Sequence, residues 1–300
     1  MIRKIIFIVL VIIALTVLWS VFKSFRESPT SVTNTFFQTN FLSEITSLIT
    51  GPLTVGSTRS PAEVDLDELG EFSPVAGMIE IVKDTDTVNV DDIFYEYVEI
   101  RANKDNAQPI NISDWSLQSM ISDTWIGIPQ GTELYVAGEV NELQDIYLRP
   151  GESAIIATRQ SPVGVSFRVN RCSGFLSDTQ DFEPTLSSLC INPREVVPPT
   201  IENLKEFGDA CVTFSENFQR CAYVTSNVNG FSGLSQACRE RIQPRLTHNF
   251  CNGVYAKDSD FYSAKEWRIF LNQNDPLWKE SYEIIRLLDE NRRTVDVFNY

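Results

Sequence analysis

The side chains of residues 94–101 alternate between two faces, as they do in an extended strand. The even positions form one face of this strand: Phe94, Glu96, Val98 and Ile100. The odd positions form the other face: Tyr95, Tyr97, Glu99 and Arg101. A period near two, with β-branched and aromatic residues throughout, predicts a β-strand. Residues 104–109 end it, because the proline at 109 lacks a backbone donor and restricts the residue before it.

A second extended segment follows this turn, with apolar side chains at positions 110, 112, 115 and 117. Trp115 is large enough to anchor a small core, from which its deletion would cost roughly 3–5 kcal/mol. We therefore expect four of these residues in the core: Val98, Ile100, Trp115 and Leu117. Shorter alternations predict further strands at 79–81, 123–129, 133–136, 153–158 and 267–271, and a closing hairpin at 284–300.

The N-terminal segment has the pattern of a membrane span. Arg3 and Lys4 precede an uncharged, Ile-, Val- and Leu-rich run at residues 5–21. At ~1.5 Å per residue this run is about 25 Å long, near the short end for a bilayer span. We expect residues 1–26 to be an uncleaved signal anchor, since bulky residues occupy the place of a small-x-small cleavage site. The alternative is a signal peptide that is removed. Residues 27–77 show no sustained period and are interpreted as a stalk.

Charge limits the class of partner. The first 26 residues hold four of the 25 basic side chains and none of the 40 acidic ones, which leaves a net charge of −19 on the rest. Nucleic-acid binding depends on clustered Lys and Arg at phosphates, so we expect no nucleic-acid partner. The carboxylates at 84, 86, 91 and 92 lack the spacing and the glycine of an EF-hand loop. A solvated acidic loop is the simpler interpretation, with a calcium site as the alternative.

Six cysteines lie in one window of the chain: Cys172, Cys190, Cys211, Cys221, Cys238 and Cys251. An even number without a C-x-x-C pair predicts structural disulfides and hence an oxidising, extracytoplasmic compartment. Buried thiols, or metal or redox chemistry, are the alternatives. The cysteines belong to a predicted insertion at 171–265, where apolar spacing indicates helices at 201–207, 234–242 and 245–255. His248 would share a helix face with Cys251, either as a nucleophile pair or as a solvent-facing histidine beside a disulfide.

Three features together resemble one family. These are the order E-Y-V-E-I and I-N-I-S-D-W-S-L at 96–100 and 110–117, the turn Leu148–Ser153, and the hairpin Ile284–Tyr300. They resemble the lamin tail domain, which occurs on nuclear lamins and on many bacterial surface and secreted proteins. The resemblance implies an immunoglobulin-like β-sandwich formed by 78–170 and 266–300 and interrupted by the insertion. Arg292 stands where the family usually has glycine, which puts the tightness of that turn in question.

The sequence favours interaction over catalysis. It contains no G-x-S-x-G, P-loop, G-x-G-x-x-G or H-E-x-x-H motif, and Glu96 and Glu99 fall on opposite strand faces. We expect no catalytic residue, metal or cofactor, and we expect binding residues at Tyr95, Tyr97 and Trp125. The expected function is a mainly β, membrane-anchored extracytoplasmic module for adhesion or envelope organisation, with a protein or surface polymer as partner. The alternatives are an envelope enzyme with its active site in the insertion, or a structural subunit of a surface assembly.

Overall fold

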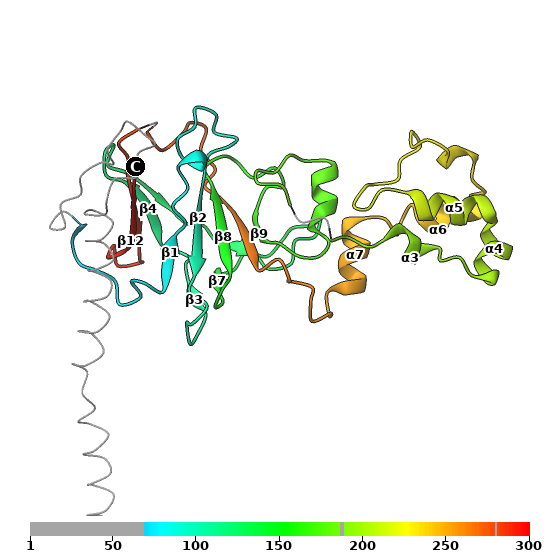
Figure 1. The fold of residues 1–300 in the computed structure, drawn as a ribbon, viewed down its shortest axis with the longest axis horizontal. Helices are drawn as coiled ribbons and strands as arrows, with labels where there is room; N and C mark the ends of the chain where they lie inside the picture. The colour runs from blue at the N-terminus through cyan, green and yellow to red at the C-terminus, as the bar shows by residue number, and fades with distance from the viewer. Residues whose placement is uncertain (1–68, 187–188, 280) are drawn as a thin grey trace, which may run out of the picture. The chain divides into compact units, whose positions relative to one another are not determined.

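The computed structural model describes residues 69–186, 189–279 and 281–300, all within one compact unit, Ser57–Tyr300. The expected membrane span at 5–21 and most of the expected stalk lie outside the described residues. Within the described ranges no helix is long and apolar enough to cross a bilayer. These residues form a mixed α/β fold with several sheets and a partly helical region that carries three disulfides (Figure 1).

The larger sheet has six strands in the order β1-β2-β8-β10-β9-β6. They are β1 (Ile79–Ile81), β2 (Tyr97–Ala102), β6 (Gly131–Thr132), β8 (Ser153–Ala157), β9 (Ser166–Arg168) and β10 (Glu266–Phe270). β10 lies between β8 and β9, parallel to the first and antiparallel to the second. A strand that follows the insertion therefore completes a sheet whose other strands precede it.

The second sheet has four antiparallel strands in the order β12-β11-β4-β5. They are β4 (Ser116–Ser119), β5 (Thr124–Gly127), β11 (Ile284–Leu288) and β12 (Thr294–Asn299). A separate pair joins β3 (Ile110–Asn111) to β7 (Tyr147–Leu148). Both strands of the predicted terminal hairpin are therefore present, and β11 pairs with β4 from the first part of the chain.

The two larger sheets bury their facing side chains in one core. One sheet contributes Val98 and Ile100 of β2 to this core. The other contributes Leu117 of β4 and Trp115, which directly precedes β4. All four are at most 2% exposed, as expected from the period of two. Trp267 on β10 belongs to the same core, so the strand after the insertion is also fixed by packing.

Two contacts close one side of this core. The Asp296 carboxylate on β12 accepts a hydrogen bond from the Ile81 backbone N–H on β1 at 2.7 Å, which links the edges of the two sheets. The Leu69 carbonyl accepts hydrogen bonds from Arg286 and Thr294, and the Leu69 side chain is 1% exposed. The packed domain therefore includes Leu69, ahead of the boundary at residue 78 that the sequence predicted.

The segment between β9 and β10 holds five α-helices among its described residues, with short 3-10 turns at Ser173–Asp178 and Phe231–Gly233. The helices are α3 (Pro193–Val196), α4 (Ile201–Phe207), α5 (Asp209–Asn217), α6 (Gln236–Ile242) and α7 (His248–Tyr255). Hydroxyl N-caps explain three of the starts, since Thr200, Ser235 and Thr247 each accept from a backbone N–H in the first turn. Gly208, with φ at 85°, separates α4 from α5.

Three disulfides lie in a second core within this segment. They join Cys172 to Cys251, Cys190 to Cys221 and Cys211 to Cys238. The prediction of disulfides is confirmed, and the alternatives of buried thiols or metal ligands are wrong. Because thiols stay reduced in the cytosol, three bridges indicate a body in an oxidising compartment.

Several local expectations need correction. The strand expected at 133–136 is absent, because the Val136 backbone N–H donates to the Asn141 side chain and so does not pair in a ladder. Helix α5 was not anticipated from the sequence. Arg292 adopts a left-handed φ of 62°, and the Asp289 carboxylate accepts from the backbone N–H groups of Asn291 and Arg293. The turn is therefore tight without glycine, because the carboxylate holds its backbone.

Candidate functional site

The expected binding residues do not share one surface. Tyr95 precedes β2, is 50% exposed, and packs edge-on against Phe94 with ring centroids 5.0 Å apart. Tyr97 packs on a third apolar cluster that includes Phe270. Trp125 is 41% exposed and donates its indole N–H to the Asp123 carboxylate at 3.1 Å.

The strand register explains the separation of Tyr97 from Trp125. Val98 faces the shared core, so Tyr97 faces away from it on the six-stranded sheet. Leu117 pairs with Ile126, and both face that core, so Trp125 faces away on the four-stranded sheet. These two aromatic residues therefore lie on the outer faces of opposed sheets, and the three expected binding residues do not form one surface.

His248 is enclosed at the start of α7. It is 1% exposed, its Nδ1 lies 3.3 Å from the Asn249 Oδ1, and its ring centroid lies 5.6 Å from that of Tyr135. Burial lowers the pKa of His248 to about 4. Its neighbour Cys251 is bonded to Cys172. The nucleophile pair is therefore wrong, because the sulfur is oxidised, and the expectation of a solvent-facing histidine is wrong as well.

Two of the carboxylates of residues 84–92 cap local turns. Asp84 accepts from the backbone N–H of Asp86 at 3.0 Å, and Asp92 accepts from that of Phe94 at 2.9 Å. Among the described residues, no group of three or more His, Cys, Asp or Glu side chains is arranged to hold a metal ion. The loop therefore has an explanation in hydrogen bonding to its own backbone.

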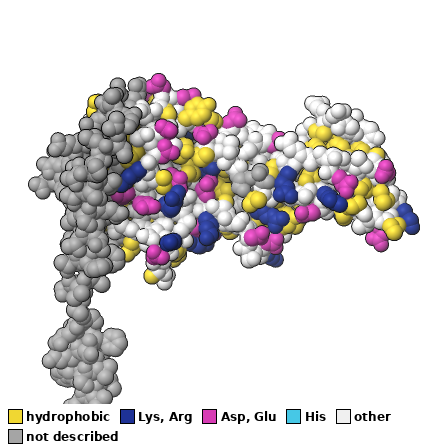
Figure 2. All heavy atoms as spheres, viewed as in Figure 1, with side chains coloured by type: hydrophobic (Ala, Val, Ile, Leu, Met, Phe, Trp, Pro, Cys, Tyr) yellow, Lys and Arg dark blue, Asp and Glu magenta, His cyan; other side chains and the backbone are white. Residues whose placement is uncertain are grey.

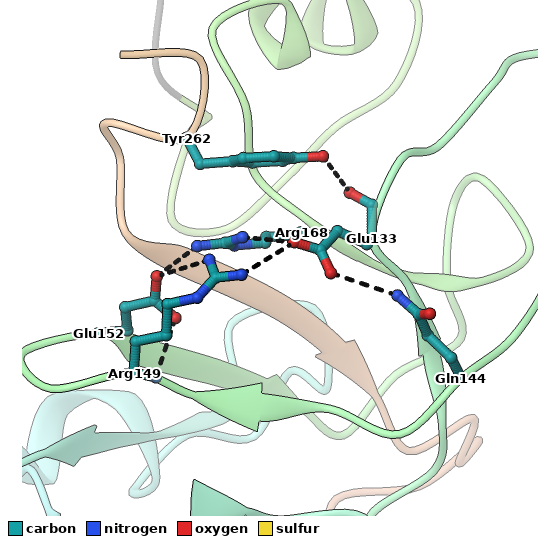
Figure 3. A network of polar contacts seen from close by, with 6 residues as sticks. All are labelled: Glu133, Gln144, Arg149, Glu152, Arg168 and Tyr262. Atoms are coloured by element: carbon teal, nitrogen blue, oxygen red, sulfur yellow. Dashed lines mark hydrogen bonds and ion pairs between the residues drawn. The ribbon is translucent and has the colours of Figure 1, made fainter. Parts of the chain in front are cut away.

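A densely connected ionic network joins the C-terminal end of the insertion to the six-stranded sheet (Figure 3). Arg168 on β9 donates to Glu152 and, at 2.6 Å, to Glu133. The Tyr262 ring lies over the Arg168 guanidinium at 4.2 Å, and the Tyr262 hydroxyl donates to the Glu133 carbonyl at 3.2 Å. Since the buried arginine has two carboxylate partners and a ring above it, the network holds the structure together and leaves little charge free for a ligand.

A recess in the surface lies among three loops. It has a volume of about 590 Å³ and is lined by Val90, Asp91, Ile121, Pro276, Trp278, Lys279, Ser281 and Tyr282. Ile121 belongs to the turn between β4 and β5, and most of the other lining residues come from the connection between β10 and β11. We call this feature the loop recess.

Buried carboxylates hold the wall of the loop recess in place. Glu96 is 0% exposed, and its carboxylate accepts from the backbone N–H groups of Leu277 at 2.8 Å and Trp278 at 3.3 Å. Glu283, also 0% exposed, accepts from the next N–H, that of Lys279, at 3.1 Å. Two carboxylates thus accept hydrogen bonds from three successive backbone N–H groups of one loop. Loops rarely have so many fixed backbone contacts, so this wall is well ordered for ligand contact.

The surroundings of Glu96 shift the pKa of its carboxyl group. Burial raises the pKa of Glu96, and the nearby Glu283 carboxylate raises it further, while the hydrogen bonds from Leu277 and Trp278 oppose the change. The Tyr300 hydroxyl donates to the Lys279 carbonyl at 2.7 Å and fixes the same stretch from the other side.

The lining of the loop recess offers contact groups of several kinds. Tyr282 is 50% exposed and Ile121 is 51% exposed, so an aromatic ring and an aliphatic side chain face solvent there. Tyr282 has a left-handed φ of 60°, a rare conformation for an aromatic residue that local structure must enforce. Asp91, Lys279 and Ser281 add a carboxylate, an ammonium group and a hydroxyl. These groups suit binding through stacking and hydrogen bonds.

Sequence reasoning missed this site for a physical reason. Glu96 lies on the core-facing side of its predicted strand, but its partners lie 181 and 182 residues later in the chain. One signal was present, because residues 271–283 form a long connection between predicted strands, and such connections in compact domains are often functional.

Comparison of the chain with models of protein families, with curated proteins and with solved structures finds no match. Function is therefore inferred from the chemistry of the chain itself. The loop recess combines exposed apolar side chains, hydrogen-bonding groups and a wall fixed by buried carboxylates.

Proposed function

We propose that this protein is a membrane-anchored, extracytoplasmic interaction module and that the loop recess is its contact surface. Its role is adhesion or envelope organisation, and its partner is a protein or a surface polymer. Residues 5–21 anchor it in the membrane and the following segment acts as a stalk. The three disulfides support the extracytoplasmic placement of the body.

The proposed fold is a lamin-tail-like, immunoglobulin-type β-sandwich interrupted by the disulfide-bonded insertion. Two sheets that share one core support it, as does the return of β10, β11 and β12 after the insertion. In such a fold, loops between strands carry function while the sheets position them. The loop recess lies among loops of this kind.

One observation carries the proposal, namely that the wall of the loop recess is fixed before any ligand arrives. Glu96, Glu283 and Tyr300 hold the backbone of residues 277–279, while Tyr282 and Ile121 remain half exposed. A binding surface gains affinity when its loops are already ordered, because less conformational entropy is lost on association. Exposed aromatic residues on such a surface commonly supply much of the binding energy.

Site-specific photo-crosslinking tests the proposal. A benzophenone side chain replaces Tyr282 in one variant of the full chain and Tyr147 in a control variant. The control is matched, because both tyrosines are 50% exposed and Tyr147 lies on β7, outside the lining of the loop recess. After irradiation of intact cells, we expect a discrete adduct at position 282 and none at position 147. Equal adducts at both positions, or none at 282, would refute the recess as the contact surface.

A further inference from the structure

The charges of the loop recess limit the class of ligand. Among the residues that the structure describes, its lining contains one carboxylate, Asp91, and one ammonium group, Lys279, which together carry no net charge. The chain beyond residue 26 has a net charge of −19, and acidic and basic side chains are interspersed over the face shown in Figure 2. An anionic ligand would be repelled by the protein as a whole, whereas a cation would be attracted to it. The balanced charge of the lining gives neither sign a net partner inside the recess, so an uncharged ligand matches the lining itself best.

The shape and polarity of the loop recess exclude a second class. Two of its apolar side chains, Tyr282 and Ile121, are half exposed, so the recess is open to water. A purely apolar ligand needs a pocket that buries most of its surface. Lipids and hydrocarbons therefore fit this site poorly.

A sugar ring has the complementary chemistry. One face of a pyranose carries C–H groups, which pack on the electron-rich face of an aromatic ring such as Tyr282. Its edge carries hydroxyl groups that can donate to the Asp91 carboxylate and accept from Lys279 or Ser281. The volume of about 590 Å³ lies within the range of small-molecule sites. It provides room for a short stretch of sugar units.

We propose that the loop recess binds an uncharged sugar segment of a surface glycan, an inference that rests on the proposed function. Tyr282 supplies the stacking surface, and Asp91 selects hydroxyl groups by accepting their protons in hydrogen bonds. Lys279 and Ser281 complete the polar rim. The fixed wall at 277–279 holds the backbone of Lys279 in place, so binding needs little ordering of that wall.

Titration of the oxidised 27–300 chain with defined oligosaccharides tests the inference. The probes are neutral tetrasaccharides of glucose, mannose, galactose and N-acetylglucosamine, with a galacturonic acid tetramer as the anionic probe. Trp278, which lines the loop recess, reports binding by its fluorescence, and calorimetry gives the dissociation constant. We expect at least one neutral probe to bind and the anionic probe to bind at least tenfold more weakly.

Variants separate the recess from the rest of the surface. Tyr282→Ala should weaken binding of the neutral probe at least tenfold, whereas Tyr282→Phe, which keeps the ring, should stay within about threefold of the original chain. Tyr147→Ala is the exposure-matched control and should have no effect. Asp91→Asn should weaken binding several-fold, because an amide oxygen is a poorer acceptor than a carboxylate.

The outcomes distinguish this inference from the proposed function. If no neutral probe binds, or the anionic probe binds as well as the neutral ones, the sugar inference is wrong. If in addition the crosslinker at position 282 captures a protein, the recess is still the contact surface and its partner is a protein. If neither assay detects binding at position 282, both proposals fail.

Discussion

Asp296→Asn should stabilise the protein at neutral pH, although it removes a charged side chain that accepts a hydrogen bond. The carboxylate accepts from the Ile81 N–H at 2.7 Å. Burial nevertheless raises the pKa of Asp296 from 3.8 to about 6, against the effect of the hydrogen bonds from Ile81 and Val297. The enclosed carboxylate is therefore more costly when ionised than when protonated. Asparagine keeps an acceptor oxygen for Ile81 and carries no charge.

The sign follows from proton linkage. The folded protein holds the Asp296 proton more tightly than the unfolded chain does, because the pKa is raised on folding. Below the pKa of the unfolded chain, the raised pKa of Asp296 adds its full contribution to the free energy of unfolding. This contribution is lost as the pH rises through the folded pKa of about 6. A shift of about two units corresponds to about 3 kcal/mol. Because residue 296 is partly open to water, we expect about 2 kcal/mol.

Denaturation of the oxidised 27–300 chain at several pH values measures this effect. At pH 7.5, Asp296→Asn should raise the free energy of unfolding by about 2 kcal/mol, or the melting temperature by roughly 4–8 °C. At pH 4 the variant and the original chain should differ little, because the original carboxylate is protonated there. Comparing the two at each pH cancels the titration of every other group.

Asp289→Asn is the matched control on the same hairpin. Although burial raises the pKa of Asp289, the hydrogen bonds from Arg293, Ser73 and Asn291 lower it overall. A lowered pKa stabilises the folded state above the unfolded value and loses this effect as pH falls. Asp289→Asn should therefore destabilise the protein at pH 7.5. If Asp296→Asn also destabilises it at pH 7.5, or changes stability equally at all pH values, the reasoning from burial is wrong.

Two further predictions concern the insertion. Burial lowers the pKa of His248 from 6.5 to about 4, so its contribution to stability is complete above pH 6.5 and is lost as pH falls towards 4. His248→Gln should remove up to about 3 kcal/mol of this pH dependence. An unchanged pH profile of the free energy of unfolding in denaturation would contradict this prediction. Replacing Cys172 and Cys251 together by serine opens a bridge of sequence separation 79 and should lower the free energy of unfolding by roughly 4 kcal/mol. A loss below about 1 kcal/mol in reversible denaturation would show that the bridge constrains little of the unfolded chain.

Local signals explain what the sequence predicted well. The alternation around Val98 and Ile100 is set by the pleat of a single strand, and it identified the core face of β2. The helix expected at 201–207 matches α4, because Thr200 caps its start and Gly208 ends it. Each of these features depends on residues within a few positions of one another, so the sequence alone contained the necessary information.

The errors arise where distant residues decide the outcome. The exposure expected for His248 followed from its helix face, but Tyr135, far away in the sequence, covers its ring. Tyr97 and Trp125 lie on different sheets because β2 pairs with β1 and β8, whereas β5 pairs with β4. The loop recess was missed because the partners of Glu96 lie beyond the insertion. None of these contacts has a local pattern.

The position of β10 between β8 and β9 has a consequence for the order of assembly during export. A chain that emerges from its N-terminus presents β8 long before its neighbour β10 exists, so the larger sheet stays incomplete with an open edge. Bringing β10 against β9 directly means joining ends roughly 100 residues apart, but the Cys172–Cys251 bond shortens the path from β9 to β10 to roughly 20 residues. The shorter path lowers the entropic barrier by about 1.4 kcal/mol, close to a tenfold gain in closure rate. Oxidation of this pair ahead of sheet completion would therefore speed the placement of β10, the last strand of the larger sheet.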